Sequence, residues 1–512
     1  MLVKTYGSAI QGIKATTITV EVNIEQGINF SLVGLPDNAV KESHERISSA
    51  LHQCGYKIPG KKIVINMAPA DIRKEGSSYD LTLAIGILAA SEQINAERIG
   101  DYLIMGELSL DGSLNPVRGA LPIALQAKKE GFKGFILPKQ NAKEAAFVDG
   151  LEILGAESIS QVINFFNSNE TIEQVKINIE QEFEKDLENY ELDFADVKGQ
   201  ENIKRAMEVA AAGSHNVILI GAPGSGKTML AKRLPSILPP LTLEESLETT
   251  KIHSVAGKIT DNRSVISVRP FRSPHHTISD VALVGGGAFP QPGEISLAHN
   301  GVLFLDELPE FKRNVLEVLR QPMEERIITI SRARQTTEYP ASFMLVAAMN
   351  PCPCGYYNHP SVDCTCTPSQ VNKYMSKISG PLLDRIDIQI EVVPVPFKDL
   401  AEKRSGEPSS VIRERVLKAR QIQKERFKSY SDVHCNAQMS KKMMNEFCKI
   451  KPEGMELLKR VMDKLGLSAR AYDRILKVAR TIADLEACPT IENHHLSEAI
   501  TYRSLDRETW GR

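Results

Sequence analysis

The sequence predicts an α/β protein of about three domains that ends in a helical region. Its 512 residues are enough for that number of domains of ordinary size. Strand-like apolar runs alternate with helical stretches as far as residue 395, which is typical of α/β folds. From residue 398 onward Glu, Lys, Arg, Leu and Met dominate and strand-like runs are few, so this part should be helical.

These patterns divide the chain into four parts. Residues 1–166 read as an α+β domain, and residues 167–192 turn polar and acidic, which indicates a linker. Residues 193–396 read as a doubly wound α/β domain. Residues 397–512 are expected to form the helical domain.

An apolar run at 217–220 leads directly into a glycine-rich octapeptide, as a buried strand leads into a phosphate-binding loop. The glycines let backbone N–H groups point at phosphate oxygens, because no Cβ stands in the way. Lys227 would reach the β- and γ-phosphates, and Thr228 would offer its hydroxyl to Mg²⁺. The loop therefore predicts binding of ATP or GTP. Its residues are Gly221, Ala222, Pro223, Gly224, Ser225, Gly226, Lys227 and Thr228.

A second apolar run, at 301–305, ends in two carboxylates, Asp306 and Glu307. In P-loop hydrolases such a strand places a Mg²⁺ ligand beside the residue that polarises the attacking water. Asp306 is the candidate ligand and Glu307 the candidate base, whereas two surface acids at a strand end are the alternative. A passive binder needs no glutamate at this place. The pair therefore favours hydrolysis, with ATP and Mg²⁺ as cofactors.

Composition limits the class of protein. The chain is 42% apolar and 25% charged, which is ordinary for a globular protein. It has no apolar stretch of about eighteen residues and no basic N-terminal segment followed by an apolar core, so we expect a cytoplasmic protein without a membrane segment. A net charge of −2 gives no overall signature of nucleic-acid binding. Any such binding would need local basic patches.

Four of the eight cysteines are clustered as two C-x-C pairs separated by nine residues. Four soft ligands suffice for a tetrahedral structural zinc site. The spacing is tighter than the usual C-x₂-C, so unliganded or redox-active thiols remain the alternative. The clustered residues are Cys352, Cys354, Cys364 and Cys366.

Several strings, in this order, resemble the AAA+ ATPases and, in detail, their magnesium-chelatase-like branch known as the YifB or ComM family. The resemblance covers essentially the whole chain and is far more specific than a single P-loop. Besides the P-loop, the resemblance rests on the motifs FADVKGQ at 194–200, RSPHHTIS at 272–279, LFLDEL at 303–308, MNPCPCG at 349–355, SGPLLDRID at 379–387 and LSARAY at 467–472.

The resemblance implies roles for further residues. Asn350 matches the sensor-1 asparagine that orients the attacking water, although asparagine also often caps a strand end. Arg385 matches the arginine finger inserted into the neighbouring subunit's site, and a surface salt bridge is its alternative. Arg470 resembles the sensor-2 arginine of the helical lid, with Arg474 as a competitor. A finger that acts in trans requires a homo-oligomer, and a hexameric ring is the family expectation.

Residues 326–338 contain two strand-like runs separated by a basic turn with Arg332 and Arg334. This segment resembles the pre-sensor hairpin of ring helicases. Pointed into a pore, the two arginines would meet single-stranded or branched DNA through its phosphates, without sequence preference. A solvated hairpin tip is the alternative.

The glycine-rich segment 281–299, which carries Phe289, is the candidate for a second pore loop, unless it merely connects two elements. His275 and His276 precede it. Paired histidines in a loop are more often polar packing residues than metal ligands, so we expect no metal there.

Two stretches within 106–138 resemble the proteolytic domain of Lon, and Ser78 falls where that family has its nucleophilic serine. A Ser–Lys protease needs a lysine amine to take the serine proton. Where Lon has this lysine the chain has Leu121 and its neighbours, and Lys128 and Lys129 lie too far along. We therefore expect a non-proteolytic domain that assembles the ring or contacts partners.

Three functions follow from these observations. The resemblance implies an ATP-driven hexamer that moves on DNA, a helicase promoting branch migration in homologous recombination and natural transformation. The alternative is a magnesium-chelatase-type ATPase that remodels a protein partner. The missing lysine argues against the third function, an ATP-dependent protease.

Overall fold

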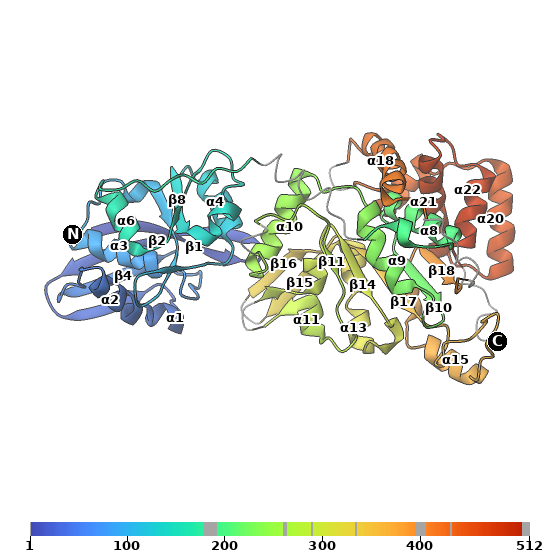
Figure 1. Cartoon of the computed structure of the whole chain (residues 1–512), viewed down its shortest axis with the longest axis horizontal. Helices are drawn as coiled ribbons and strands as arrows, with labels where there is room; N and C mark the ends of the chain where they lie inside the picture. Colours follow the sequence, from blue (N-terminus) through green and yellow to red (C-terminus); the bar gives the residue numbers. More distant parts are fainter. Residues whose placement is uncertain are drawn as a thin grey trace. The chain divides into compact units, whose positions relative to one another are not determined.

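The computed structural model describes residues 2–178, 192–259, 264–287, 290–332, 335–395, 406–430 and 433–503, which form two compact units (Figure 1). The first unit comprises Met1–Asp186 and Leu243–Ser267. The second comprises Leu187–Thr242 and Val268–Arg512. Of the predicted linker, residues 179–191 lie outside the described part of the chain.

The first unit is built on a seven-stranded mixed sheet. Its strands, in spatial order, are β3 (Asn29–Val33), β4 (Lys62–Ala68), β2 (Lys14–Glu25), β1 (Leu2–Gln11), β5 (Tyr102–Ile104), β8 (Gly134–Pro138) and β9 (Glu152–Ala156). β1 and β2 form an antiparallel hairpin, and β5, β8 and β9 run parallel to β1. Buried and partly exposed residues alternate along the Thr-, Val- and Ile-rich β2, as expected of a strand with one face on the core.

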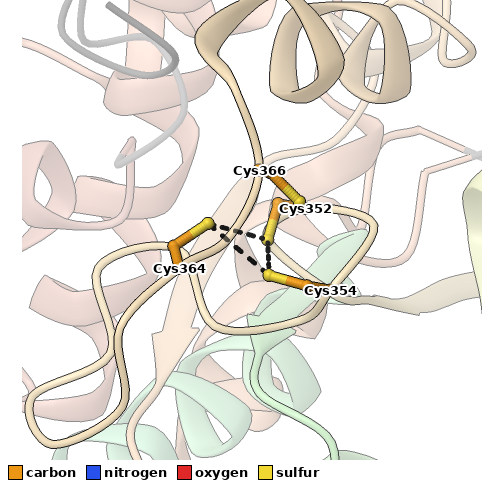
Figure 2. Close-up of side chains that lie close together, drawn as sticks. All are labelled: Cys352, Cys354, Cys364 and Cys366. Carbon is orange, nitrogen blue, oxygen red and sulfur yellow. Dashed lines mark hydrogen bonds between the residues drawn. The ribbon is translucent and has the colours of Figure 1, made fainter.

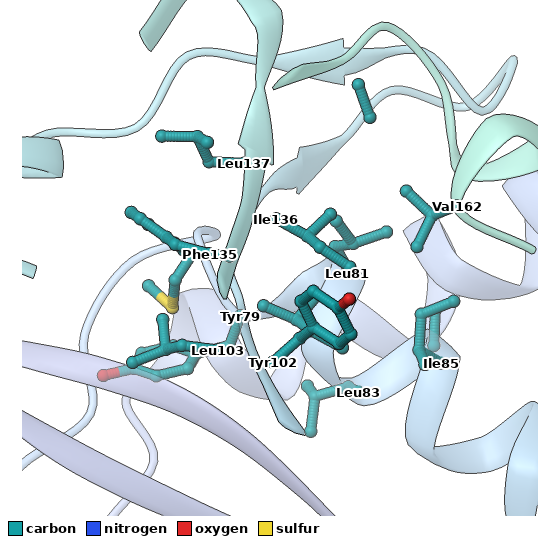
Figure 3. Close-up of a cluster of buried hydrophobic side chains, with 14 of the residues drawn as sticks. Tyr79, Leu81, Leu83, Ile85, Tyr102, Leu103, Phe135, Ile136, Leu137 and Val162 are labelled. Atoms are coloured by element: carbon teal, nitrogen blue, oxygen red, sulfur yellow. The ribbon is translucent and has the colours of Figure 1, made fainter. Parts of the chain in front are cut away.

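Helices from the N-terminal part of the chain accompany this sheet: α1 (Asn38–Lys41), α2 (Ser43–Gln53), α3 (Asp80–Ala90), α4 (Ala120–Lys129), α5 (Lys139–Ala145) and α6 (Ile159–Phe166). Every residue of α3 is buried, because this helix is apolar on all sides. Figure 3 shows Leu81, Leu83 and Ile85 of α3 among side chains of β5, β8 and α6. The predicted N-terminal α+β domain is confirmed.

The beginning of the predicted linker belongs to the first unit's core, which the sequence analysis did not anticipate. The Val175 amide donates to the Ile153 carbonyl of β9 over 2.9 Å. Ile172, Val175 and Ile177 pack against the core. Three apolar residues among polar ones give no helical or strand periodicity, so the sequence alone did not reveal this segment.

A segment from the predicted nucleotide-binding domain also belongs to the first unit. It contains α10 (Leu243–Val255) and ends at Ser267. Val265 is part of the first unit's apolar core, and Leu247 packs against it. The Ser254 hydroxyl donates to the buried carboxylate of Glu144. Residues 243–267 therefore form an insertion that leaves the predicted 193–396 domain.

The second unit contains a five-stranded sheet in which all neighbours are parallel. Its strands, in spatial order, are β11 (Phe271–Arg272), β14 (Val302–Leu305), β17 (Met344–Met349), β10 (Val217–Gly221) and β18 (Ile388–Val392). β10, β14 and β17 are buried throughout, which is typical of a parallel sheet covered on both faces. The predicted α/β fold with a parallel sheet is confirmed.

Helices and two β-hairpins surround this sheet. The helices named below are α8 (Glu201–Gly213), α9 (Lys227–Arg233), α11 (Asp280–Val284), α12 (Glu294–Leu297), α13 (Arg313–Glu317), α14 (Arg320–Glu325), α15 (Pro368–Met375) and α16 (Gly380–Leu383). One hairpin pairs β12 (Gly285–Gly286) with β13 (Gln291–Pro292), and another pairs β15 (Ile327–Arg332) with β16 (Gln335–Pro340).

The C-terminal part is helical, as predicted. Its α-helices are α18 (Ser409–Arg426), α19 (Lys441–Phe447), α20 (Pro452–Leu465), α21 (Ala469–Leu485) and α22 (Asn493–Thr501). α18 and α21 pack on each other and on α8, so these helices share one core with the parallel sheet (Figure 1). Among the described residues, no helix combines the length and apolar character that crossing a bilayer requires.

Candidate nucleotide-binding site

The glycine-rich loop joins an inner strand of the parallel sheet to a helix. It follows β10, which lies between β17 and β18, and it leads into α9 at Lys227. Gly224 and Gly226 have φ values of 77° and 96°, in the left-handed region that residues with a Cβ atom rarely adopt. The glycines thus let the loop turn tightly, and the first N–H groups of α9 face it.

The Lys227 side chain is folded back onto this loop. Its Nζ donates to the carbonyls of Gly221 over 2.6 Å and Ala222 over 2.9 Å. Burial lowers the pKa of Lys227, and the Asp306 carboxylate acts in the opposite direction. A phosphate would offer the ammonium group a charged acceptor, which makes a stronger hydrogen bond than neutral carbonyls do.

Thr228 and Asp306 are brought together, as a shared metal ion would require. The Thr228 hydroxyl donates to Asp306 Oδ2 over 2.7 Å. Asp306 directly follows β14, and Thr228 lies in the first turn of α9. A hydroxyl and a carboxylate oxygen are ligands that suit Mg²⁺, which keeps several waters and uses few protein ligands. The residues therefore fit the ion that the sequence predicts.

Glu307 contacts His276, for which the sequence predicts a polar packing role. His276 Nδ1 lies 3.1 Å from Glu307 Oε2. Glu307 itself has a positive φ of 52°, which is unusual for a side chain of this size. His276 follows β11, the neighbour of β14, so adjacent parallel strands deliver both residues to the same edge of the sheet.

Two further residues hold the loop. Ser225 Oγ is buried and has no hydrogen-bond partner within the described part of the chain, so a phosphate oxygen would satisfy it. Gln200 Nε2 donates to the Ser225 carbonyl and to the Val393 carbonyl, each over 3.0 Å. Gln200 thus clamps the loop to the segment after β18. In the sequence, Gln200 is only the last residue of the string FADVKGQ, and no local pattern marks it as a clamp.

Asn350 lies at the same edge of the sheet. It directly follows β17, the neighbour of β10, and its Oδ1 accepts from Lys227 Nζ over 3.3 Å. Burial raises the pKa of Tyr374 in α15, and the nearby Asn350 backbone acts in the opposite direction. Direct contacts therefore join the sequence-predicted residues in two pairs, Lys227 with Asn350 and Thr228 with Asp306.

Arg385, the candidate finger, is held within its own chain. Its Nη1 donates to the Pro381 carbonyl over 2.6 Å, and its Nη2 lies 2.5 Å from Glu324 Oε1. The side chain is buried, with 9% exposure. To reach a neighbouring subunit, this guanidinium would have to leave Glu324.

The two candidates for sensor 2 differ in their surroundings. Arg470 is exposed, and its Nη1 lies 3.2 Å from Asp384 Oδ2, next to the candidate finger. Arg474 Nη1 lies 2.9 Å from Asp387 Oδ1, in a buried group with His215. Burial alone would raise the pKa of Asp387, but the charge of Arg474 and the nearby His215, whose Nδ1 lies 3.7 Å from Asp387 Oδ2, hold it below its ordinary value. Arg470 is thus the more accessible of the two.

The four clustered cysteines converge in a loop that follows Asn350 (Figure 2). The Sγ atoms of Cys352 and Cys354 are 3.3 Å apart, and each lies within 3.7 Å of Cys364 Sγ. The ligand atoms of all four residues lie within 4.8 Å of one another. A tetrahedral zinc ion with Zn–S bonds of about 2.3 Å requires sulfur separations of about 3.8 Å. The cluster therefore fits zinc.

A second group of metal-ligating side chains has a structural role. His494 Nε2 and His495 Nε2 both lie 3.0 Å from Glu486 Oε2. His495 Nδ1 accepts the Glu492 amide over 2.9 Å, as part of the capping box of α22. Because Nδ1 is an acceptor, the neutral ring carries its proton on Nε2 and donates it to Glu486. That nitrogen therefore has no lone pair for a metal.

Three family models match consecutive parts of the chain. The one described as "Subunit ChlI of Mg-chelatase" matches residues 20–141, "Magnesium chelatase, subunit ChlI" matches 193–400, and "Magnesium chelatase, subunit ChlI C-terminal" matches 406–503. The protein YifB of Escherichia coli (strain K12) is 45% identical over 506 residues, which cover 98% of this chain and 96% of YifB. Competence protein ComM of Haemophilus influenzae is 44% identical over 504 residues, covering 98% and 97%.

The chain belongs to the YifB/ComM family. The family models, the P-loop and the parallel sheet together make it a magnesium-chelatase-like ATPase of the AAA+ type. Lon protease 2 of Bacillus subtilis (strain 168) is 30% identical over 141 residues, which cover 27% of this chain and 25% of the protease. The N-terminal part of this YifB/ComM-family chain is therefore Lon-like.

The Lon-like unit of this YifB/ComM-family chain has an apolar residue at the expected lysine position. Leu121 lies in α4 and is fully buried, and its amide donates to Glu144 Oε1 over 2.8 Å. Ser78 is only partly exposed, and the neighbouring Ser77 hydroxyl donates to Glu107.

The predicted basic hairpin of this family member forms, but its tip is only partly described. β15 and β16 pair antiparallel, with Arg332 opposite Gln335 at their ends. Arg334 lies outside the described residues, as does Phe289 of the candidate second pore loop. The Tyr339 hydroxyl of β16 donates to the Pro290 carbonyl over 2.7 Å, which joins the hairpin to that second loop.

Proposed function

We propose that this chain is an ATP-hydrolysing ring motor that acts on DNA as a helicase. It promotes branch migration in homologous recombination and natural transformation, and it works as a homo-oligomer, a hexamer. The contact between Thr228 and Asp306, beside the Lys227–Asn350 contact, carries the hydrolytic part of the proposal. The full-length likeness to a protein named for competence supports the DNA part.

Each residue of the site has a distinct task in hydrolysis. The loop amides and Lys227 hold the phosphates, and Lys227 offsets the negative charge that grows as the terminal phosphoryl group leaves. Thr228 and Asp306 would hold Mg²⁺, which neutralises phosphate charge when it is bound. Glu307 accepts a proton from the attacking water, and Asn350 orients that water. Arg385 of a neighbouring subunit would complete the site, as Arg470 would from the lid.

The cysteine cluster is a structural zinc site in this proposal. Its fit rests on the sulfur separations of 3.3 to 3.7 Å and on four ligands without an open position. Zinc would supply a rigid cross-link and no chemistry at the phosphates. Metal analysis of the purified protein tests this part.

The hairpin of β15 and β16 is the proposed DNA contact. Its tip carries two arginines within three residues, Arg332 and Arg334. Arginines at such a tip bind phosphates through charge, and their affinity falls steeply as salt rises. Tyr339 joins the hairpin to the Gly285–Pro292 loop, so the two segments can move together. Motion of the hairpin with hydrolysis would move DNA.

A second function, an ATPase that remodels a protein partner, is favoured by one observation. The family models that match all three parts of the chain are described by magnesium chelatase. In that case the hairpin would contact a polypeptide, and DNA would have no effect on hydrolysis.

The deciding experiment measures ATP hydrolysis with and without single-stranded and branched DNA at moderate salt. We expect DNA to stimulate the wild type. The Glu307→Gln variant should bind ATP and fail to hydrolyse it, because it has no base. Lys227→Ala should lose nucleotide binding.

The hairpin is tested with a charge-matched control. Arg332→Ala/Arg334→Ala should abolish DNA binding and stimulation while basal hydrolysis continues. Lys441→Ala/Lys442→Ala removes two exposed charges at the start of α19 and should bind DNA normally. Basal hydrolysis that no DNA form stimulates would favour the protein-remodelling function.

A further inference from the structure

The cysteine loop touches the phosphate-binding loop directly. Gly355, which follows Cys354, has a φ of 87°, and a Cβ placed on it would lie 2.6 Å from Pro223 Cδ and 2.9 Å from Pro223 Cγ. Only a glycine allows so close an approach. Pro223 is part of the octapeptide that would hold the phosphates. One wall of this octapeptide is therefore the backbone of the cysteine loop.

The same loop begins at Asn350. This residue contacts Lys227 Nζ through its side chain, and Cys352, which is buried, follows two residues later. The Gly355 amide donates to the Cys352 carbonyl over 3.0 Å, so a tight turn connects the two. Any shift of Cys352 or Cys354 would therefore displace both Asn350 and the backbone against Pro223.

The far end of the loop returns to Asn350. Thr367, which follows Cys366, caps α15: its hydroxyl accepts the Gln370 amide over 3.3 Å, and its own amide donates to Gln370 Oε1 over 2.9 Å. Tyr374, near the end of α15, lies beside the Asn350 backbone. The two cysteine pairs thus lie at the two ends of a loop that closes on the sensor residue.

Between Pro351 and Thr367 the chain forms turns and irregular structure, without a helix or strand. Such a segment has few backbone hydrogen bonds to hold its shape. The four thiol groups that converge in Figure 2 bring the two ends of this segment together. A metal that fixes them would order the segment, because metal-binding energy becomes folding energy in small metal-bound loops.

We propose that zinc in the four-cysteine cluster fixes the wall of the nucleotide site, so that loss of the metal weakens ATP binding. This inference rests on the proposed function, since it assumes that ATP binds at the octapeptide. The metal acts on Pro223 and Asn350 through the loop and not on the phosphates. The cysteines are therefore positioning residues.

The first test compares zinc content with nucleotide binding in the full-length chain. Wild type is expected to contain about one zinc ion per chain by elemental analysis, as a closed four-ligand site would. Cys364→Ser/Cys366→Ser should lose the zinc and bind a fluorescent ATP analogue on the order of tenfold more weakly. Cys488→Ser, a partly exposed cysteine outside the cluster, should change neither quantity.

Two further variants separate the metal from the nucleotide. Gly355→Ala keeps all four cysteines and should retain zinc, while its added methyl group presses on Pro223 and weakens nucleotide binding. Lys227→Ala should also retain zinc and lose nucleotide binding. Retained zinc in both variants also shows that the loop is folded, so weak binding cannot be attributed to general unfolding.

The outcomes distinguish this inference from the proposed function. Wild type without zinc, or a zinc-free Cys364→Ser/Cys366→Ser variant that binds the ATP analogue as tightly as wild type, would overturn the inference and leave the proposed motor intact. Normal nucleotide binding by Gly355→Ala would also overturn it. Zinc-loaded wild type that binds no nucleotide would instead refute the proposed function.

Discussion

His276 Nδ1 lies 3.1 Å from Oε2 of Glu307, the residue proposed to take a proton from the attacking water. His276 is held in turn by ring contacts, with a centroid distance of 4.1 Å to His275 and 6.4 Å to Phe311. Glu307 is the more exposed partner, at 58% against 30% for His276. The histidine therefore orients the carboxylate and holds it at the edge of the sheet.

Replacement of His276 tests this role. In His276→Ala the Glu307 carboxylate loses its partner and samples unproductive rotamers, so we expect kcat to fall about tenfold while the KM for ATP stays nearly unchanged. Steady-state ATPase kinetics measure both quantities. His275→Ala is the matched control, since His275 bonds to the Thr277 hydroxyl instead. A rise in KM without a change in kcat would contradict an orienting role.

The Arg385–Glu324 ion pair predicts a result for mixed oligomers. If Arg385 acts on the neighbouring site, Arg385→Ala should bind ATP without hydrolysing it, because its own P-loop is intact. Mixing it with Glu307→Gln should restore part of the activity, since some interfaces then combine an intact base with an intact finger. Each variant alone is the control. Mixtures as inactive as their components would mean that Arg385 has no role in trans.

The same pair should restrain the finger. Glu324→Gln removes the charge that holds the Arg385 guanidinium, so we expect a moderate rise in the basal ATPase rate of the assembled protein, by about two- to fivefold. Glu325→Gln, one residue along, is the control, because Glu325 Oε2 accepts from Gln321 and not from Arg385. A lower rate in Glu324→Gln would show that the pair supports the active geometry.

Lys477 predicts a pH dependence of stability. Burial, with the nearby charge of Arg474, lowers its pKa to about 8, whereas an unfolded lysine has a pKa of about 10.4. Between these values the unfolded state holds more protons, so this group makes the free energy of unfolding increase as pH rises through this range. The gain should reach on the order of 3 kcal/mol by about pH 10.4.

Lys477→Met isolates this contribution. Tyrosines with raised pKa values lower stability at high pH in both proteins, so the difference between wild type and variant reports Lys477 alone. Denaturant unfolding at several pH values from about 7 to about 10.5 measures it. We expect the stability of wild type relative to the variant to rise across this range. A constant difference would show that Lys477 is not buried as described.

The bond between Ser254 and Glu144 predicts that α10 stabilises the Lon-like unit. Ser254→Ala leaves a buried carboxylate with one donor fewer and should cost about 1–3 kcal/mol. Hydrogen exchange of α4 and α5 in the full-length chain measures this local loss. In a cycle with Glu144→Gln, the two effects should be non-additive by about 1 kcal/mol, because both variants disturb one bond. Additive effects would argue against a direct interaction.

Much of the site can be predicted from the sequence because local sequence motifs mark its residues. Glycines at fixed spacing after an apolar run mark the loop at 221–228, and an apolar run ending in two carboxylates marks Asp306 and Glu307. Strands β10, β14 and β17 are continuous apolar runs, so their approximate positions could be predicted. The helical end was visible from composition alone.

Contacts between distant segments could not be predicted in this way. The contact between His276 and Glu307 requires that β11 lies beside β14, and no local sequence pattern predicts this pairing. The approach of Gly355 to Pro223 depends on the fold of an irregular loop. Likewise, the docking of 243–267 in the first unit rests on single residues such as Val265 and Ser254, whose burial the sequence does not reveal.

That docking has a mechanical consequence. Because Leu243–Ser267 leaves the second unit and returns to it, the chain passes between the two units three times. A domain that is joined to the rest of a protein by a single linker is separated by one cut in that linker. Here three connections join the two units, and two of them lead to the opposite ends of the segment Leu243–Ser267. A single cut in any one of these connections would therefore leave the two units joined by the other two.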